Sequence, residues 1–411
     1  MPLTLPLDPR ARPAHPVVFL LLITPFGVNA GYLSVAVAYL LSQAGVTVEQ
    51  IAGLIAVSFI PQTWKFLWAP VADTTLARKK WYVIGGVINA AGLLAMGLLP
   101  ATPASLPMLY GVAFLSNVAV TFLAMATESL MVFDTPDGAK GRVSGWFQAG
   151  NLGGSGIGGG AGLWLAQALP APWMGGAVLA IACLACCIAL LFVREPPPMP
   201  RTRNIVRNLA LVGRDLWSVA RSRAGALALL ICFLPIGTGA ASGLWSAVAD
   251  DWRATADTVA LVTGVASGLV SAAGCFLGGW LCDRMDRKAA YGLFGVLLAI
   301  CAAAMALAPR TQATYIVFTM IYSLISGLSY AGFTAVTLEA IGQGAAATKY
   351  NLFASLSNMP IAYMTVIDGW AHTAWGAAGM LYTEAAVGVL GVGAFLLIMS
   401  ATRRPAAAPA S

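Results

Sequence analysis

The chain has 411 residues, of which 59% are hydrophobic and 9% are charged, and its formal net charge is +7. A soluble globular domain carries about 25% charged residues, so this composition excludes that class. The basic residues are spread over many short loops rather than gathered on one stretch, which argues against a nucleic-acid-binding protein.

Long apolar runs follow one another along the whole chain. A membrane-spanning helix needs about 20 predominantly apolar residues. By this measure we expect an all-α integral membrane protein. The sequence predicts twelve transmembrane helices, at about residues 17–41, 49–70, 81–99, 106–131, 142–168, 172–193, 224–248, 257–281, 289–308, 313–340, 346–370 and 377–400.

The distribution of lysine and arginine predicts the orientation of these helices. With both termini in the cytoplasm, 20 of the 23 basic residues fall on the cytoplasmic side. Only Arg253 and Arg310 fall on the outer side, and Lys65 lies within a span. This bias follows the positive-inside rule. We therefore expect a multi-pass protein that contacts membrane lipids and has both termini in the cytoplasm.

The second half of the chain repeats the first half with a displacement of 210 or 211 residues, so that Asp73 recurs as Asp283 and Glu128 as Glu339. Parallel repeats of about six helices, related by an axis along the membrane normal, build one class of secondary transporter. We therefore expect two pseudo-symmetric six-helix bundles. The predicted parts are a cytoplasmic tail (residues 1–16), a first bundle (17–193), a basic cytoplasmic linker (194–223), a second bundle (224–400) and a second cytoplasmic tail (401–411).

The linker 194–223 is polar and carries seven arginines. Proline residues at 196–198 stop the sixth helix. We interpret the linker as a tether between the two bundles. Alternatively, its part 204–221 lies along the membrane surface with its arginines facing anionic lipid.

The loop after the second helix of each half carries a motif of small, acidic and basic residues. Small residues let a helix end pack closely on its neighbour, and an aspartate caps a helix or pairs with a basic side chain. The motif resembles the glycine–aspartate–basic signature of the major facilitator superfamily, which implies a major facilitator fold with a cytoplasmic gate. The gate residues are Asp73, Arg78 and Lys79 in the first half and Gly279, Asp283, Arg284, Arg287 and Lys288 in the second half.

Three short stretches carry a finer resemblance. Residues 65–73 (KFLWAPVAD), 162–166 (GLWLA) and 347–350 (ATKY) are similar to stretches of AmpG-type muropeptide permeases. That wider family includes siderophore permeases of bacterial inner membranes and acetyl-coenzyme A carriers. The resemblance implies a location in the bacterial inner membrane and an organic solute, and the length of the chain fits the shorter siderophore permeases. The sequence departs from the AmpG-type pattern at Glu128, where that family has an aspartate.

Charged residues inside predicted spans are candidates for the transport path, because a charge at the bilayer centre costs about 2.5–3.5 kcal/mol. Lys65 either lines the cavity and pairs with an anionic solute, or it snorkels or pairs with another helix. Asp368 and Glu384 lie nearer the outer face, and we expect them at solvated helix ends.

Glu128 and Glu339 occupy matched places near the cytoplasmic ends of the fourth and tenth helices. Each either carries a proton, since burial favours the neutral carboxyl, or pairs with the basic gate residues two helices earlier. Their symmetric placement favours the gate, so both functions stay open at this point.

Uncharged polar residues form the second group of path candidates. Amides in lipid are unfavourable unless they are paired, so these side chains are expected to face the protein interior. Each either contacts the solute or forms a hydrogen bond between helices. Pro25 and Gly27 permit a bend in the first helix, and the seventh helix repeats this feature, which favours both as central pathway helices. The candidates are Asn29, Tyr32, Asn117, Gln148, Asn151, Asn358 and Tyr363.

The fifth helix is rich in glycine between Gly150 and Gly162. It does not follow a strand and no P-loop lysine follows it, so it is not a nucleotide-binding loop. We expect these glycines to allow close helix packing. Drug-export antiporters of the superfamily carry a glycine–proline pair in this helix, whereas no proline interrupts it here.

Enzymatic chemistry has little support in the sequence. The two histidines, His15 and His372, belong to no metal-ligand cluster or nucleophilic triad. We expect no enzyme activity, no metal and no cofactor. No nucleotide motif is present to drive primary transport, so an ion gradient or the solute gradient supplies the energy.

The sequence predicts a secondary active transporter, expected to be monomeric, that works by alternating access. Its expected partners are a small organic solute and protons, with import of a muropeptide or a siderophore-like compound. The alternatives are a drug or metabolite exporter of the same fold and a non-transporting membrane receptor.

Overall fold

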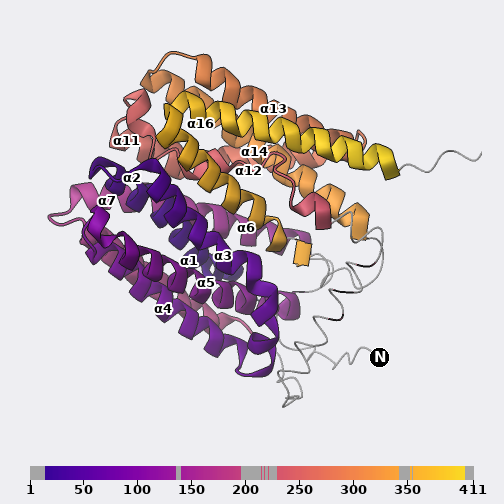
Figure 1. Cartoon of the computed structure of the whole chain (residues 1–411). Helices are drawn as coiled ribbons and strands as arrows, with labels where there is room; N and C mark the ends of the chain where they lie inside the picture. The colour runs from indigo at the N-terminus through magenta and orange to yellow at the C-terminus, as the bar shows by residue number, and fades with distance from the viewer. Residues whose placement is uncertain are drawn as a thin grey trace, which may run out of the picture.

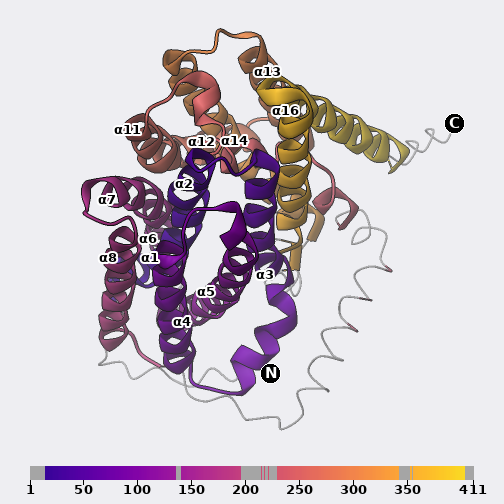
Figure 2. The ribbon, with the colours of Figure 1, turned by 60° about the vertical axis from the view of Figure 1, so that its left-hand side comes forward.

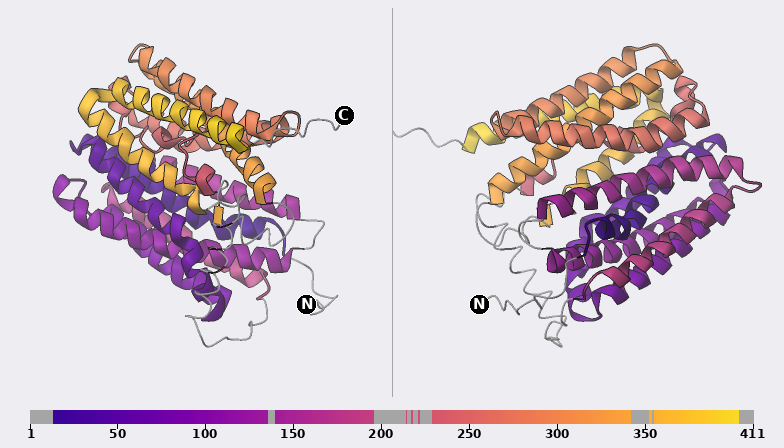
Figure 3. Two further views of the ribbon diagram at one scale, coloured as in Figure 1. Left: turned by 45° about the vertical axis from the view of Figure 1, so that its right-hand side comes forward. Right: turned by 180° about the vertical axis from the view of Figure 1, so that it is seen from behind.

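The computed structural model of the chain describes residues 14–135, 140–195, 229–341 and 352–402 except 354, together with residues 214, 217 and 221. Every regular element in these ranges is a helix. Figure 1 shows the N-terminal half, coloured indigo to magenta, and the C-terminal half, coloured orange to yellow, as two bundles of long helices. The other views show the same two bundles lying side by side (Figures 2 and 3). This is the two-bundle membrane fold that the duplication predicted.

The first half begins with one long helix whose geometry changes along its length. An α-helical part is followed by a π-helical part and a second α-helical part, and the change comes shortly after Pro25. The elements of this half are α1 (Val17–Gly31), η1 (Tyr32–Val37), α2 (Ala38–Gln43), α3 (Val48–Thr74), α4 (Arg78–Leu98), η2 (Pro103–Ser105), α5 (Leu106–Asp134), α6 (Lys140–Gly156), η4 (Ile157–Ala161), α7 (Gly162–Ala168), α8 (Trp173–Ala185) and η5 (Cys186–Phe192).

The second half follows the same plan from its second helix onward. Helices α4 and α13 each have 21 residues and begin in the basic clusters of the two halves, at Arg78 and Arg287. This correspondence supports the duplication read from the sequence. The described elements are η6 (Ala240–Gly243), η7 (Ala249–Trp252), α11 (Ala256–Thr258), η8 (Val259–Ala266), α12 (Ser267–Cys282), α13 (Arg287–Leu307), α14 (Gln312–Ile341) and α16 (Asn358–Thr402).

Nine helices in the described ranges are long and apolar enough to cross a membrane. Helix α16 has 45 residues, or about 68 Å at 1.5 Å per residue, which is twice the thickness of a bilayer core. Gly376 breaks it with a φ of 71°, so that its two arms correspond to the last two predicted spans. The helical count is therefore consistent with twelve spans.

The seventh predicted span, residues 224–248, is not a continuous helix where the structure describes it. Residues 233–252 form turns, bends and short 3-10 segments. Pro235 lacks a backbone donor, and Gly237 and Gly239 have φ angles of 56° and 66°, which no helix accommodates. The predicted span is therefore interrupted at the proline and glycine where the sequence permits a bend.

Glycines bring α1 and α6 into backbone contact, as the glycine-rich sequence predicted. A Cβ atom at Gly31 would lie 1.9 Å from the carbonyl oxygen of Ser155, and one at Gly154 would lie 2.4 Å from that of Thr24. At the boundary between the halves, a Cβ at Gly264 would lie 2.6 Å from Gly160. Small residues thus set the helix spacing within the first half and between the halves.

The hydrophobic core shows how the halves meet. One cluster combines both halves, with Val46 and Leu109 from the first and Trp252 and Met380 from the second. The remaining clusters each draw on one half alone, such as the one around Tyr82. The halves therefore share a core at one end and have separate cores at the other. In the orientation predicted from the basic residues, the shared end is the outer one.

Candidate functional site

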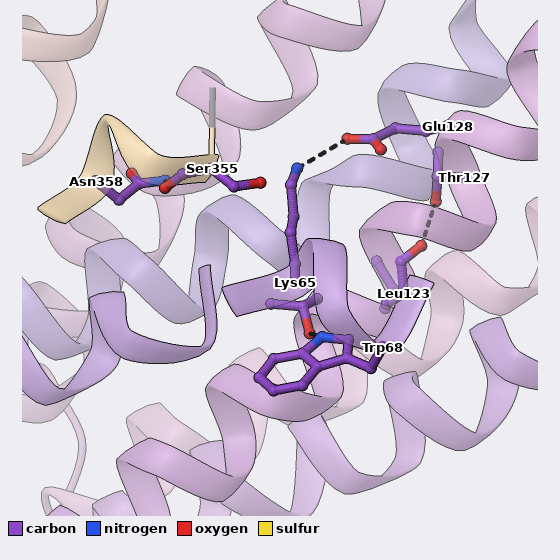
Figure 4. A network of polar contacts seen from close by, with 8 residues as sticks. Lys65, Trp68, Leu123, Thr127, Glu128, Ser355 and Asn358 are labelled. Carbon is purple, nitrogen blue, oxygen red and sulfur yellow. Dashed lines mark hydrogen bonds and ion pairs between the residues drawn. The ribbon is translucent and has the colours of Figure 1, made fainter. Parts of the chain in front are cut away.

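An ion pair lies inside the first half at the depth of the membrane. The ammonium group of Lys65 on α3 is 3.6 Å from Oε1 of Glu128 on α5. The side chains are 21% and 34% exposed, so both are accessible from the space around them. Figure 4 shows the two side chains extended toward each other. Lys65 thus pairs with a neighbouring helix, as one of its two interpretations from the sequence expected. Its partial exposure also leaves the ammonium group accessible to a solute.

Glu128 makes this ion pair with Lys65, whereas the gate interpretation expected Arg78 or Lys79 as its partner. The Arg78 guanidinium instead donates from Nε to the Ser129 hydroxyl at 3.2 Å. Glu128 lies one residue before Ser129 on the same helix, so its side chain leaves α5 in a different direction and meets α3. In this conformation Glu128 therefore pairs with Lys65 rather than with the basic gate residues. The side chain of Glu339, its counterpart, lies outside the described residues.

Aromatic packing fixes the helices that carry the pair. The Trp68 indole on α3 donates a 3.1 Å hydrogen bond to the hydroxyl of Thr121 on α5. The ring of Phe122 stacks on Trp81 with centroids 4.5 Å apart and on Trp68 at 6.5 Å. Because α3, α4 and α5 are tied in this way, the spacing between Lys65 and Glu128 is set by rigid elements.

The second half contributes polar groups beside the pair. Figure 4 shows Ser355 with its side chain directed toward Lys65, and Asn358 next to it at the start of α16. The Asn358 amide donates to the carbonyl of Ser355 at 3.1 Å. This predicted path residue therefore lies on the second half, opposite the charged pair of the first half.

Asn29 lies in a buried polar cluster of the first half. Its side-chain amide donates to Asn89 Oδ1 at 2.7 Å and to the Ser116 hydroxyl at 2.5 Å. Tyr32, one turn later, is also buried, and its ring lies close to Gly97, Gly162 and Gly176 of the neighbouring helices. In this conformation both residues connect helices of one bundle, and neither is exposed.

The other amides predicted for the path have different surroundings. Asn117 is buried, and its amide donates to the carbonyl of Ala113 on its own helix at 2.9 Å. Gln148 is exposed and Asn151 is half-buried, both on α6. The half-buried Tyr363 donates its hydroxyl to the Phe233 carbonyl at 2.8 Å. Among these four, Gln148, Asn151 and Tyr363 have the exposure that solute contact requires in this conformation.

The cytoplasmic motif of the first half is held by the residue that follows the sixth helix. Glu195 accepts hydrogen bonds from the backbone amides of Arg78 at 2.7 Å and Lys79 at 3.2 Å, at the start of α4. A carboxylate at this position satisfies orphan amides and stabilises the positive end of the helix dipole. Asp73 lies on α3, and its side chain falls outside the described residues.

The matching motif of the second half is exposed. Helix α12 ends at Cys282, and Asp283 follows it as the C-cap. The Arg284 guanidinium lies 3.8 Å above the Trp280 ring, and Asp286 accepts the backbone amide of Ala289 at 2.9 Å to begin α13. Arg287 and Lys288 are the first two residues of α13, and a Cβ at Gly279 would meet no other atom within 4 Å.

Polar contacts close the end where the halves share a core. Gln43 donates to Asp250 at 2.6 Å, and the Ser246 hydroxyl donates to the Ser34 carbonyl at 2.8 Å. Both contacts join the two halves. A Cβ at Gly369 would lie only 2.3 Å from that of Ala52, so α16 also packs tightly on α3. We call these contacts, with the apolar side chains around them, the outer seal.

Two acidic residues that the sequence interpretation set aside are buried. Asp368 is 0% exposed and Glu384 is 5% exposed, so the expectation of solvated helix ends was wrong. The two lie eight residues before and after Gly376, which places both about 12 Å from the turn on facing arms of α16. This equal spacing was readable in the sequence, but only the described turn shows that the arms lie together.

No group of three or more His, Cys, Asp and Glu side chains with the arrangement of a metal site occurs among the described residues. The cysteines in that part of the chain are all free thiols, and Cys183 and Cys186 lie in an apolar helix.

Comparison with known proteins gives a consistent result. The family model described as Major Facilitator Superfamily matches residues 18–363. No curated protein matches the chain at the level of sequence.

Solved structures share the fold over nearly the whole chain. The nucleoside transporter NupG superposes with a TM-score of 0.71 at 13% identity, covering 94% of this chain and 99% of that one. A POT family transporter in complex with 5-aminolevulinic acid superposes with a TM-score of 0.74 at 12% identity, covering 94% of this chain and 96% of that one. A D-xylose–proton symporter superposes with a TM-score of 0.70 at 13% identity, covering 92% of this chain and 96% of that one. The chain therefore belongs to the Major Facilitator Superfamily and is a multi-pass membrane transporter rather than an enzyme.

Proposed function

We propose that this chain is a proton-coupled carrier that imports an organic anion, a muropeptide or a siderophore-like compound, across the bacterial inner membrane. The observation that carries the proposal is the accessible ion pair between Lys65 and Glu128. A charged pair at membrane depth is expensive and is found where it serves a substrate or ion pathway. The resemblance of residues 65–73 to AmpG-type permeases adds support for the class of solute.

The pair suits an exchange of partners. Its 3.6 Å separation is longer than a tight charge-assisted hydrogen bond of about 2.7–2.9 Å, so the Lys65 ammonium keeps donors for a second acceptor. A solute carboxylate that enters from the space between the halves would compete with Glu128 for Lys65. The solute carboxylate would then replace Glu128 as the partner of Lys65.

The division of the hydrophobic core supports alternating access. One core joins the halves at the predicted outer end, and separate cores lie at the other end. Such an arrangement is that of an inward-facing state, with the solute site connected to the cytoplasm. Rocking of the halves would open the outer seal and bring the separate ends together.

Proton coupling draws on two further points. The carboxylate of Glu128 lies 3.6 Å from the ammonium group that would bind the solute, so solute binding and a carboxylate are linked. One structural neighbour is a D-xylose–proton symporter, so this fold accommodates coupling to protons.

The test is uptake by proteoliposomes that contain the purified protein. Labelled anhydro-muropeptide and labelled ferric siderophore are offered separately, each with and without an inward proton gradient. We expect one of them to accumulate, and the gradient to increase the accumulated amount. Lys65→Ala should reduce uptake by roughly 10- to 100-fold, because a hydrogen bond to a charged group contributes about 1.5–3 kcal/mol.

Two controls sharpen this experiment. Lys80→Ala removes an exposed lysine of α4 and should transport as the wild type does. The exchanged variant Lys65→Glu/Glu128→Lys keeps an ion pair but moves the positive charge to α5, and we expect it to fold and to lose uptake. The proposal would be contradicted if Lys65→Ala took up solute at the wild-type rate, or if uptake were the same with and without the proton gradient.

A further inference from the structure

The most deeply buried acidic groups of the described residues lie in the second half, away from the Lys65 pair. Asp368 and Glu384 project from the two arms of α16, and Tyr322 projects from α14 toward Glu384. All three are at most 5% exposed. Asp368 lies near enough to Glu384 to interact with it electrostatically, and Tyr322 interacts with both. The three side chains thus form one cluster.

This cluster contains more acceptors than donors. The Tyr322 hydroxyl donates to Oε1 of Glu384, and the backbone amide of Ala241 faces that carboxyl group. Oε2 of Glu384 and both carboxyl oxygens of Asp368 have no hydrogen-bond partner within the described part of the chain. An unpaired buried carboxylate is very unfavourable. The cluster therefore requires a further hydrogen-bond donor or a positive charge.

No basic side chain in the described ranges supplies that charge. The Arg310 guanidinium lies 4.4 Å above the Trp252 ring, and His372, one turn along α16 from Asp368, is 2.6 Å from Asp251. The other titratable group that interacts with Glu384 is the Cys301 thiol on α13. Two neighbouring carboxylates without a counter-ion do not both stay ionised, because like charges in an apolar interior repel strongly.

A cavity reaches this cluster. A small cavity is lined by Glu384, Met364 and Thr238 among others. A second cavity is lined by Thr238, Ser329 and Ser357. Gly237 and Thr238 belong to both, in the segment where positive φ angles prevent a helix. The broken seventh span therefore separates two neighbouring cavities, one lined by Ser357 and the other by Glu384.

We propose that Asp368 and Glu384 form a proton-binding site that is loaded and unloaded through these cavities and that couples transport to the proton gradient. In the binding step, one proton from water joins a carboxylate oxygen and gives a neutral carboxylic acid, which removes one of the two neighbouring negative charges. Release is the reverse step. The inference rests on the proposed proton-coupled function and names its site.

A proton fits this cluster better than a metal cation does. One proton supplies the missing donor and removes one charge without any further ligand. A hard cation needs a shell of about six or more oxygen ligands, and the cluster offers two carboxyl groups and one hydroxyl that already donates to Glu384.

The site is connected to the outer seal. The Tyr322 ring packs edge-on against Trp245, with centroids 5.2 Å apart at 86°. The next residue, Ser246, donates across the halves to Ser34. Ala241, whose amide faces Glu384, belongs to the shared core. A change of charge at Glu384 therefore acts on the same short segment that closes the outer end.

The proton site is tested by infrared difference spectroscopy of the purified protein between acidic and alkaline buffer, in water and in deuterium oxide. A protonated buried carboxyl group gives a carbonyl-stretch band that shifts on deuteration. We expect this band in the wild type, its loss or reduction in Asp368→Asn and Glu384→Gln, and its retention in Glu49→Gln, which removes an exposed carboxylate. Absence of the band from the wild type, or its persistence in both variants, would overturn the site.

A second measurement requires no variant. Dicyclohexylcarbodiimide reacts with protonated carboxyl groups in apolar surroundings and leaves a stable acylurea that mass spectrometry locates. We expect modification at Asp368 or Glu384, with protection at alkaline pH. Modification of exposed carboxyl groups alone would contradict the proposal. Both measurements stand apart from transport, so they succeed even if neither offered solute is carried.

Transport assays test the role of this site in proton coupling independently of which solute is carried. Glu384→Gln should lose accumulation driven by the proton gradient and keep exchange of labelled for unlabelled solute, because exchange needs no net proton movement. Full gradient-driven accumulation in both Asp368→Asn and Glu384→Gln would refute coupling at this site while leaving the proposed function intact. Accumulation driven by a sodium gradient and not by protons would refute both.

Discussion

Asn29 joins three helices of the first half through a single side chain. Its amide reaches Asn89 on α4 and Ser116 on α5, and the Asn89 amide in turn donates to the Pro25 carbonyl on α1 at 3.3 Å. Pro25 removes a backbone hydrogen bond from α1, and the side-chain cluster supplies polar contacts beside it. The residue therefore stabilises a bent helix in a place where lipid and water provide no hydrogen bonds.

Replacing this amide tests its structural contribution. Asn29→Ala leaves Asn89 and Ser116 without a shared donor in a buried site, so we expect a loss of about 1–2 kcal/mol of stability. Thermal unfolding in detergent measures the effect as a lower midpoint. Gln148→Ala, at an exposed amide, serves as the control and should unfold like the wild type. An unchanged midpoint for Asn29→Ala would contradict the stabilising role.

At the scale of the element, glycine spacing decides how close two helices lie. Gly150, Gly154 and Gly158 repeat every four residues and so form one stripe along α6 and η4. A Cβ at any of these positions would come within 2.4 Å of a backbone oxygen of α1. Gly153, on the same helix, has no other atom within 4 Å. The stripe rather than the glycine content brings the helices together.

This difference gives a matched pair of variants. Gly154→Ala forces α6 away from α1, and we expect a lower folded yield and a lower unfolding midpoint. Gly153→Ala should be neutral or stabilising by about 0.5–1 kcal/mol, because alanine favours the helix and meets open space. Size-exclusion profiles and thermal unfolding of the two purified variants measure this. Equal behaviour of both would show that the close approach tolerates a methyl group.

At the scale of the whole molecule, the outer seal holds the two halves together. Gly369 permits the contact between α16 and Ala52 of α3, and the Ser246 hydroxyl crosses to Ser34. The separate cores at the opposite end leave each half free to rotate about this shared region. The stability of the seal therefore sets how often the outer end opens.

A larger side chain at Gly369 should open that end. We expect Gly369→Val to raise the labelling rate of Ser246→Cys, which is buried in the closed seal, by a membrane-impermeant maleimide added from outside. Gly393→Val on the same helix meets no other atom within 4 Å and should leave the rate unchanged. The protein without Ser246→Cys gives the background from native thiols. Faster labelling in the control alone would refute the role of Gly369 in the seal.

The sequence by itself determined the membrane class, the duplication, the two-bundle fold and the close glycine packing. These features follow from composition and from local periodicity, which need no knowledge of distant contacts. The partners of Glu128 and the burial of Asp368 and Glu384 were decided only by tertiary structure. A carboxylate near a predicted helix end has the same local sequence whether solvent or a neighbouring arm covers it. The turn at Gly376 and the packing of α14 settle that difference, because they place two acidic side chains at one depth beside Tyr322.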